Sequence, residues 1–265
     1  MEGMATPLGA LICDIDGVIL QDEHTLPGAP ELVAWLKARD LPCVFLTNYS
    51  SQTPEDLKNR FRNAGLDVSA EHFYTSAMAT AEFLLSQGQE RQRAFVVGDG
   101  ALVHALYQAG FTVSETEADF VVLGETKSYN FDMIQRAAQL VAGGARFIAT
   151  NPDVTGPRGR PSCGALCAPI ERITGRVPFY VGKPGAFMMR AALRHLKART
   201  DETWMVGDNM DTDILAGVQA GMVTALVLTG VSREDDLPRY AYRPVHTVKD
   251  AHELKTLLEA HVRAG

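Results

Sequence analysis

Short apolar runs alternate with longer amphipathic segments along the chain, and this alternation constrains the fold more than any other feature. Towards the two ends of the chain, the strand-like runs lie at 10–13, 43–48, 203–208 and 224–230, and the helix-like segments lie at 30–39, 53–65, 186–198 and 212–221. Thr53 can cap a helix, Pro54 suits its first position, and Gly65 suits a left-handed exit. The alternation predicts an α/β fold with a doubly wound parallel sheet, covered by helices on both faces.

The middle of the chain has an alternation of its own. Strand-like runs lie at 94–98, 119–125 and 146–153, and helix-like segments lie at 101–110 and 132–144. The chain has 265 residues, which is enough for one large domain or two modest ones. We therefore expect the middle stretch to form a second α/β domain inserted into the first.

Two carboxylates follow the first apolar run, in the sequence LICDIDGVIL at 11–20. In a strand, residues i and i+2 point to the same side, so Asp14 and Asp16 would face one spot. At about 4 Å, two like charges repel by roughly 4 kcal/mol at an effective dielectric constant near 20. A cation, a shared proton or a divergent backbone must relieve this repulsion. The alternative is a turn in which Asp16 and Gly17 only end the strand.

Polar residues follow three further runs. Thr47 and Asn48 end the second run, and Lys183 ends the later run FYVGKP. Asp208 ends the run TWMVGD, and Asp213 follows five residues later. Each of these ends could by itself be a turn, a solvated charge or a helix cap. Ligands of open α/β sheets bind outside the carboxyl ends of strands, so four such ends in one chain favour a single site.

These residue types together indicate phosphoryl transfer supported by Mg²⁺. Several carboxylates with one lysine and no clustered histidine suit a hard cation. One carboxylate can attack phosphorus to form an aspartyl-phosphate, and the second can protonate the leaving oxygen and then deprotonate the attacking water. Lys183 would neutralise charge on the transferred group.

Composition and competing motifs argue against several other classes. The formal net charge is −7, which argues against binding to a nucleic-acid polymer or an anionic membrane. No apolar run reaches the ~18 residues of a membrane span, and the first residues lack a signal-peptide pattern, so we expect a cytoplasmic protein. Its four cysteines are expected to be reduced thiols. Gly98 and Gly100 form a weak dinucleotide fingerprint, because Val103 stands where the third glycine belongs.

With these motifs in order, the sequence resembles the haloacid dehalogenase (HAD) superfamily of aspartate-nucleophile phosphatases. DIDGVI resembles the first motif of that family, LTN the second, the lysine of VGKP the third, and GDNMDTD the fourth. The segments LTNYSSQT, FYTSAMATAEFL, GETKSYNFDM, ARFIATNPD, CGALCAPIE and VGDNMDTDILAG extend the resemblance to the NagD subfamily over essentially the whole chain. The resemblance implies a catalytic core at 1–78 and 182–265, with an inserted C2-type α/β cap at 79–181 that sets substrate specificity.

The resemblance also implies a role for each site residue. Asp14 would be the nucleophile and a Mg²⁺ ligand, and Asp16 would be the acid/base and a ligand through its main-chain carbonyl. Asp208 would complete the metal site, and Asp213 would orient the loop around it. The residues implied to bind the phosphate or to line the substrate side are Thr47, Asn48, Lys183, Asn209, Met210, Asp211 and Thr212.

The implied substrate is a small phosphomonoester, with nucleoside 5′-monophosphates such as UMP first. The alternative substrates are pyridoxal phosphate, phosphoglycolate, sugar phosphates and p-nitrophenyl phosphate. The alternative function is a non-catalytic sensor of phosphorylated ligands. Close relatives often carry a basic residue where this chain has Asp211, and an acidic group there is expected to disfavour an anionic substrate. Arg158 and Arg160 of the cap could contact a base or ribose, or could be solvated loop charges. We expect a monomer or a homodimer.

Overall fold

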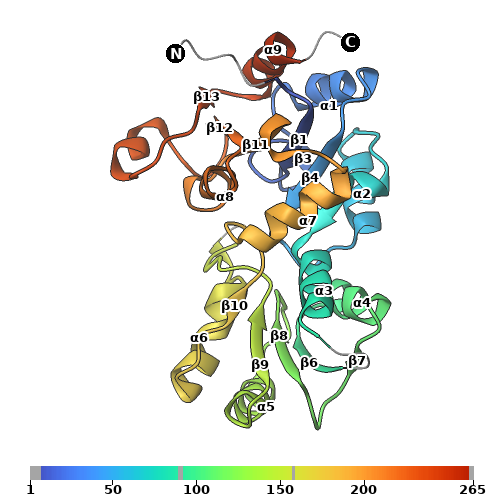
Figure 1. Ribbon diagram of the computed structural model, residues 1–265, viewed down its shortest axis with the longest axis vertical. Coiled ribbons are helices and arrows are strands. Elements are labelled where there is room, and N and C mark those ends of the chain that lie inside the picture. Colours follow the sequence, from blue (N-terminus) through green and yellow to red (C-terminus); the bar gives the residue numbers. More distant parts are fainter. Residues whose placement is uncertain (1–6, 89–91, 157–158, 263–265) are drawn as a thin grey trace. The chain divides into compact units, whose positions relative to one another are not determined.

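The structure is a computed structural model that describes residues 7–88, 92–156 and 159–262. The chain forms two compact units (Figure 1). The first unit comprises Met1–Thr47, Pro54–Tyr74 and Met189–Gly265, and the second unit comprises Asn48–Thr53 and Thr75–Met188. The second unit is therefore built from chain that is inserted between segments of the first.

The first unit is built on a six-stranded sheet in the order β13-β12-β11-β1-β4-β5. Its strands are β1 (Ala10–Asp14), β4 (Cys43–Thr47), β5 (Phe73–Thr75), β11 (Thr203–Gly207), β12 (Val223–Val227) and β13 (His246–Val248). β1 pairs in parallel with β4 on one side and with β11 on the other, and β12 and β13 continue the sheet in parallel. The helices that accompany it are α1 (Ala29–Ala38), α2 (Pro54–Asn63), α7 (Ala186–Leu196), α8 (Leu215–Ala220) and α9 (Ala251–His261).

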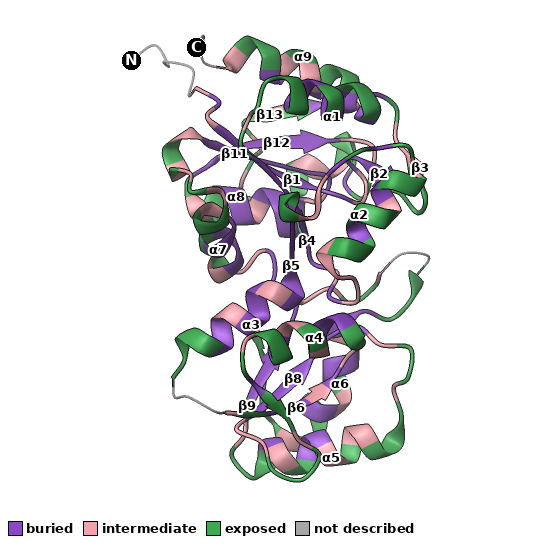
Figure 2. Cartoon of the chain, turned by 90° about the vertical axis from the view of Figure 1, so that its right-hand side faces the viewer, coloured by how far each residue is buried: buried purple, intermediate pink, exposed green. Residues whose placement is uncertain are grey.

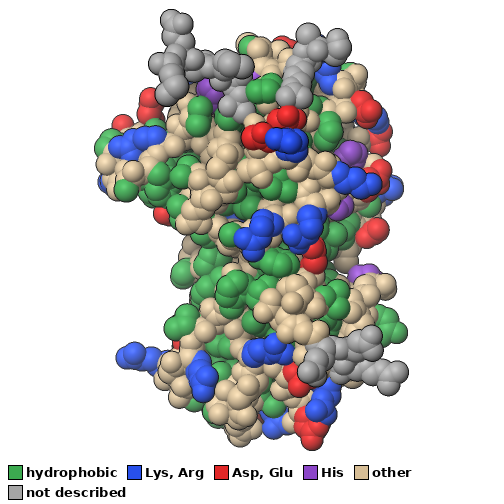
Figure 3. Space-filling view, viewed as in Figure 1, with side chains coloured by type: hydrophobic (Ala, Val, Ile, Leu, Met, Phe, Trp, Pro, Cys, Tyr) green, Lys and Arg blue, Asp and Glu red, His purple; other side chains and the backbone are tan. Residues whose placement is uncertain are grey.

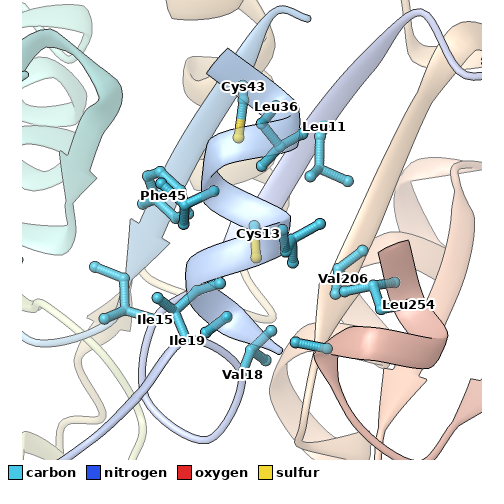
Figure 4. Close-up of a cluster of buried hydrophobic side chains, with 14 of the residues drawn as sticks. Leu11, Cys13, Ile15, Val18, Ile19, Leu36, Cys43, Phe45, Val206 and Leu254 are labelled. Atoms are coloured by element: carbon cyan, nitrogen blue, oxygen red, sulfur yellow. The ribbon is translucent and has the colours of Figure 1, made fainter. Parts of the chain in front are cut away.

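Helices cover both faces of this sheet because successive strand residues point to opposite sides. Cys13 of β1 and Val206 of β11 lie in one buried cluster with residues of α1, α2 and α9, among them Leu36 and Leu254 (Figure 4). Met205 faces the other side, where α8 approaches so closely that a methyl group on Gly217 would lie 3.0 Å from the Met205 Cβ. The predicted doubly wound parallel sheet is confirmed.

The second unit has a five-stranded sheet of its own, in the order β10-β9-β8-β6-β7. The strands are β6 (Arg93–Val97), β7 (Thr112–Val113), β8 (Phe120–Leu123), β9 (Arg146–Ala149) and β10 (Phe179–Tyr180), all paired in parallel. The helices are α3 (Ser76–Ser86), α4 (Gly100–Gln108), α5 (Phe131–Ala142) and α6 (Cys163–Thr174). α5 and α6 cover one face, where they share a buried apolar cluster with β6, β8 and β9, and α3 packs against α4. In Figure 2 the buried residues lie in the strands and on the inner sides of the helices.

Short elements complete the described chain. They are the hairpin of β2 (Leu20–Gln21) and β3 (His24–Thr25), the 3₁₀ helices Ala70–His72, Thr200–Glu202 and Glu234–Arg239, and a π-helical turn, η4 (Met210–Ile214). All four cysteines are buried free thiols. Among the described residues, no helix has the length and apolar character to cross a membrane. Acidic and basic side chains are interspersed on the face shown in Figure 3.

The predictions of local structure agree with the structure, but the predicted position of the run before Lys183 does not. Pro54 begins α2, and Gly65 adopts a positive φ of 85° just beyond its end. The run before Lys183 is a strand, but β10 ends at Tyr180 and belongs to the sheet of the second unit. α3, α6 and α9 were not expected from the apolar pattern.

The aromatic centre of the first unit yields a stability prediction. Phe61 is fully buried, and its ring centroid lies 5.2 Å from that of Phe45 and 4.8 Å from that of Phe73. We expect Phe61→Ala to lower the free energy of unfolding by about 3–5 kcal/mol in urea denaturation, because it leaves a cavity. The control Phe131→Ala removes a ring that is 74% exposed and should change it by less than about 0.5 kcal/mol. Equal effects of the two changes would contradict this account of the core.

Candidate active site

Three buried carboxylates meet at the carboxyl end of the first unit's sheet. Asp14 is the last residue of β1, and Asp208 directly follows β11, the strand beside it. Asp14, Asp208 and Asp213 each offer a carboxylate oxygen, and these oxygens all lie within 4.8 Å of one another. Each of the three residues is at most 8% exposed. Because parallel strands end at one edge of a sheet, neighbouring strand ends bring these acids together.

Two glycines leave the space that Asp208 occupies. Gly17 has a φ of 84°, and a methyl group on either Gly17 or Gly230 would overlap the carboxyl group of Asp208. The loop after β12 then holds this acid, since the Val231 amide donates to Asp208 Oδ2 at 2.6 Å. Thr229 Oγ1 donates to the Gly17 carbonyl at 2.5 Å, which ties the same loop to the turn after β1.

The residues of the fourth motif form the π-helical turn η4 and its cap. Asn209 caps this turn, because its Oδ1 accepts from the Asp211 amide at 2.9 Å. The Asn209 amide donates to Asp213 Oδ2 at 3.1 Å, so Asp213 is bound from within its own turn. Thr212 is buried, and the side chain of Met210 is fully buried in an apolar cluster with Ile214. Met210 is fully buried, its amide donates to Ser232 Oγ at 2.9 Å, and it exposes neither its side chain nor its main chain to solvent.

Two tyrosines from the segment after the 3₁₀ helix Glu234–Arg239 bind this turn from outside. The Tyr240 hydroxyl donates to Asp211 Oδ2 at 2.9 Å, and the Tyr242 hydroxyl donates to the Met210 carbonyl at 2.9 Å. Desolvation, together with the hydrogen bond to Asp211, raises the pKa of Tyr240 to about 12. The phenol is neutral at physiological pH and therefore does not compensate the charge of Asp211.

Asp16 does not continue the strand that contains Asp14, so the strand geometry expected from the sequence does not apply to it. β1 ends at Asp14, and Asp16 forms only an isolated bridge with Leu20. Its carboxylate is bound by Arg60 of α2, whose Nη2 donates to Asp16 Oδ1 at 2.6 Å. Burial disfavours the charge of this guanidinium, but the hydrogen bond and the negative charge of Asp16 raise the pKa of Arg60. Sequence reasoning missed Arg60.

Asn48 and Lys183 are joined within the second unit. Asn48 Oδ1 accepts from the Lys183 amide at 2.7 Å, and Asn48 Nδ2 donates to the Lys183 carbonyl at 3.0 Å. Asn48 Nδ2 also donates to Asp153 Oδ2 at 3.0 Å. Thr47, the residue before Asn48, ends β4 in the first unit and is 4% exposed. Of the two cap arginines, Arg160 is exposed and Arg158 lies outside the described residues.

A buried glutamate that sequence reasoning missed organises the surroundings of Asn48. Glu125 is 5% exposed and follows β8. Its Oε2 accepts from the Ser50 amide at 2.9 Å and from the Ser50 hydroxyl, and its Oε1 accepts from Asn151 Nδ2 at 2.6 Å and from Ser162 Oγ at 3.0 Å. Asn151 Nδ2 also donates to the Asn48 carbonyl at 2.7 Å. The signal was present in the sequence, because Glu125 ends an apolar run just as Asp14 does.

The acid cluster fits a hard divalent cation. Three buried carboxylates close to one another repel, and a cation bound between them would turn this repulsion into attraction. Oxygen ligands without histidine or cysteine suit Mg²⁺. The residues present in the first unit therefore satisfy the chemical requirement of a magnesium site.

Comparison with known families agrees with these motifs. A family model described as haloacid dehalogenase-like hydrolase matches residues 11–112, and an HAD-hydrolase-like model matches residues 180–254. Ribonucleotide monophosphatase NagD of Escherichia coli (strain K12) is 57% identical over 234 residues, which cover 88% of this chain and 93% of the relative. The chain belongs to the haloacid dehalogenase-like hydrolases. Within that family it is a phosphatase of the NagD type, a hydrolase of phosphoric monoesters, and it has the parallel-sheet core and cap of that fold.

Two further comparisons extend this assignment. The dihydroxyacetone phosphatase of Corynebacterium glutamicum (strain R) is 43% identical over 246 residues, which cover 92% of this chain and 89% of the relative. The structure of NagD from E. coli K-12 has a TM-score of 0.90 at 55% identity and covers 93% of this chain and 98% of that chain. These relatives are named for different small phosphate esters. The family assignment therefore identifies the type of reaction but not the substrate.

The Glu125 cluster yields a second stability prediction. We expect Glu125→Ala to destabilise the protein by about 2–3 kcal/mol, because Asn151 and Ser162 lose a buried acceptor. Glu125→Gln should recover part of this loss, since one oxygen remains. Amide hydrogen exchange should accelerate at 48–53 and 150–153 in both variants. Glu115→Ala, which removes an exposed acid of the same unit, serves as the control. Unchanged exchange in Glu125→Ala would contradict the organising role.

Proposed function

We propose that the protein hydrolyses nucleoside 5′-monophosphates of the UMP type, with Mg²⁺, through an aspartyl-phosphate on Asp14. The observation that carries this proposal is the cluster of Asp14, Asp208 and Asp213 at the carboxyl end of the sheet. The relative named ribonucleotide monophosphatase supports the choice of substrate. Mg²⁺, held by Asp14, Asp208 and the main-chain carbonyl of Asp16, would offset the negative charge of the nucleophile and the phosphate.

The proposed reaction has two steps that divide work between two aspartates. In the first, an Asp14 oxygen bonds to phosphorus while the ester P–O bond breaks, and Asp16 gives its proton to the leaving oxygen. In the second, Asp16 takes a proton from water as that water attacks phosphorus. The acyl-phosphate bond then breaks, and Asp14 is restored as inorganic phosphate leaves.

Other residues would bind the substrate. Thr47 and Asn48 would donate to the phosphoryl oxygens, and Lys183 would balance their charge. Asp213 would orient the loop that carries Asp208. Asn209, Met210, Asp211 and Thr212 would line the substrate side. We also propose a catalytic core at 1–78 and 182–265 with a specificity-setting cap at 79–181, in a cytoplasmic monomer or homodimer.

A sugar phosphate or another small phosphomonoester is the second candidate substrate. The relative named dihydroxyacetone phosphatase supports this candidate, because it shares the same length of chain. The exposed carboxylate of Asp211, within the fourth motif, disfavours a substrate with a second anionic group, and phosphoglycolate is therefore the least favoured member of this class. Pyridoxal phosphate and phosphoglycolate are further members of the same class.

A substrate panel tests the choice between these candidates. We expect kcat/KM with Mg²⁺ to be highest for UMP and other nucleoside 5′-monophosphates, and lower for dihydroxyacetone phosphate, pyridoxal phosphate, phosphoglycolate and p-nitrophenyl phosphate. EDTA should abolish phosphate release, and added Mg²⁺ should restore it. A clear preference for a sugar phosphate would replace the proposed substrate. Full activity after exhaustive chelation would contradict the proposed requirement for Mg²⁺.

Asp14→Asn tests the nucleophile. The amide cannot attack phosphorus, so we expect kcat to fall by at least about 10⁴-fold. The thermal unfolding temperature should equal or exceed that of the wild type, because the change removes one of three mutually repelling charges. Rapid quenching of the wild type with ³²P-labelled substrate should place the label on Asp14. Asp235→Asn, an exposed acid elsewhere in the first unit, should leave kcat unchanged. Label on another residue would rule out the assignment.

A further inference from the structure

The carboxylate of Asp16 is held by a single guanidinium. Arg60 Nη2 lies 2.6 Å from Asp16 Oδ1, and Arg60 Nη1 lies 3.4 Å from Asp16 Oδ2. Both carboxylate oxygens therefore face the planar fork of one arginine, a geometry that restricts rotation as well as position. The Asp16 side chain is 40% exposed, so burial alone does not restrict its rotamers.

Arg60 is itself fixed before it reaches Asp16. Its side chain is only 11% exposed. Its Nε donates to the Asp22 carbonyl at 3.1 Å, and its Nη2 donates to the same carbonyl at 2.5 Å. Asp22 lies in the turn of the β2–β3 hairpin and has a positive φ of 54°. The guanidinium thus links α2, this hairpin and Asp16.

The environment of Arg60 differs from that of an ordinary surface arginine. Arg62 lies in the same last turn of α2, but it is exposed. A solvated ion pair contributes little, because solvent screens it and both side chains lose conformational freedom. A guanidinium that is nearly buried and bound at three nitrogens can instead hold its partner at one place.

We propose that Arg60 is a positioning residue that orients the Asp16 carboxyl group for proton transfer to the leaving oxygen. This inference rests on the proposed acid–base role of Asp16. In that role the proton moves from Asp16 to the ester oxygen while the P–O bond breaks, and later from water to Asp16. Proton transfer of this kind requires hydrogen-bond reach and alignment, and a displacement of 1 Å costs up to about 100-fold in rate.

A misplaced acid has a kinetic signature that general damage lacks. An ester with a weakly basic leaving group departs without much help from a proton, whereas a strongly basic leaving group needs one. Loss of orientation at Asp16 therefore slows esters of basic leaving groups most. The ratio kcat/KM reports the step in which this bond breaks, whichever step limits kcat.

The experiment compares the slopes of log kcat/KM against leaving-group pKa for substituted phenyl phosphates. We expect Arg60→Met to steepen the slope, with a loss of about 10- to 100-fold for the most basic leaving group and less than about 3-fold for p-nitrophenyl phosphate. Arg60→Lys should give an intermediate slope, because one ammonium group reaches one oxygen. The matched control Arg62→Met should keep the slope of the wild type.

Two reference results separate failure of this inference from failure of the proposed function. Asp16→Asn should give the steepest slope of all. If it does and Arg60→Met shifts all esters equally, the positioning role is rejected while the acid–base role stands. If Asp16→Asn keeps the wild-type slope, the acid–base role is rejected and the positioning role with it. Should Arg60→Met fail to fold by circular dichroism, Arg60→Lys decides by the same criterion.

Discussion

Three buried carboxylates lie close together at the end of one sheet, and their mutual repulsion is the constraint that the surrounding structure has to offset. With oxygens of Asp14, Asp208 and Asp213 within 4.8 Å of one another, each ionised pair repels by roughly 3–4 kcal/mol at an effective dielectric constant near 20. Hydrogen bonds from the Val231 and Asn209 amides offset part of this cost. The buried cluster therefore does not stabilise the folded chain by itself. A bound cation would neutralise part of the negative charge and remove this cost.

The second unit contains a related constraint, a buried carboxylate that accepts several hydrogen bonds. Glu125 is a charged residue with 5% exposure, and burying such a group costs free energy unless it is bound. Glu125 accepts from two serines and an asparagine, and the backbone of Lys183 is paired on both sides by Asn48. Since Asn151 bonds both Glu125 and the Asn48 carbonyl, one continuous network runs from Glu125 to Lys183. Such a network restricts Asn48 to one orientation.

The sequence predicted the parts of the molecule that local rules decide. Strand runs, the start of α2 and the exit at Gly65 follow from periodicity and backbone chemistry within a few residues. The pairing of β10 could not follow from such rules, because the sheet that a run joins depends on distant strands. The contact between Arg60 and Asp16 could not be predicted from local rules either. The two residues are 44 positions apart, and a basic residue in the last turn of a helix is usually solvated.

Asp211 shows why the reaction was easier to predict than the substrate. Its carboxylate is bound by Tyr240, and Tyr242 binds the carbonyl of the preceding residue, so both tyrosines restrain the turn. A neutral phenol fixes the orientation of Asp211 and leaves its charge in place. A basic residue at this position would also remove the acceptor of the hydrogen bond from Tyr240. The orientation of Asp211, which we propose to line the substrate side, therefore depends on a residue 29 positions away, and a motif of consecutive residues describes only one member of this pair.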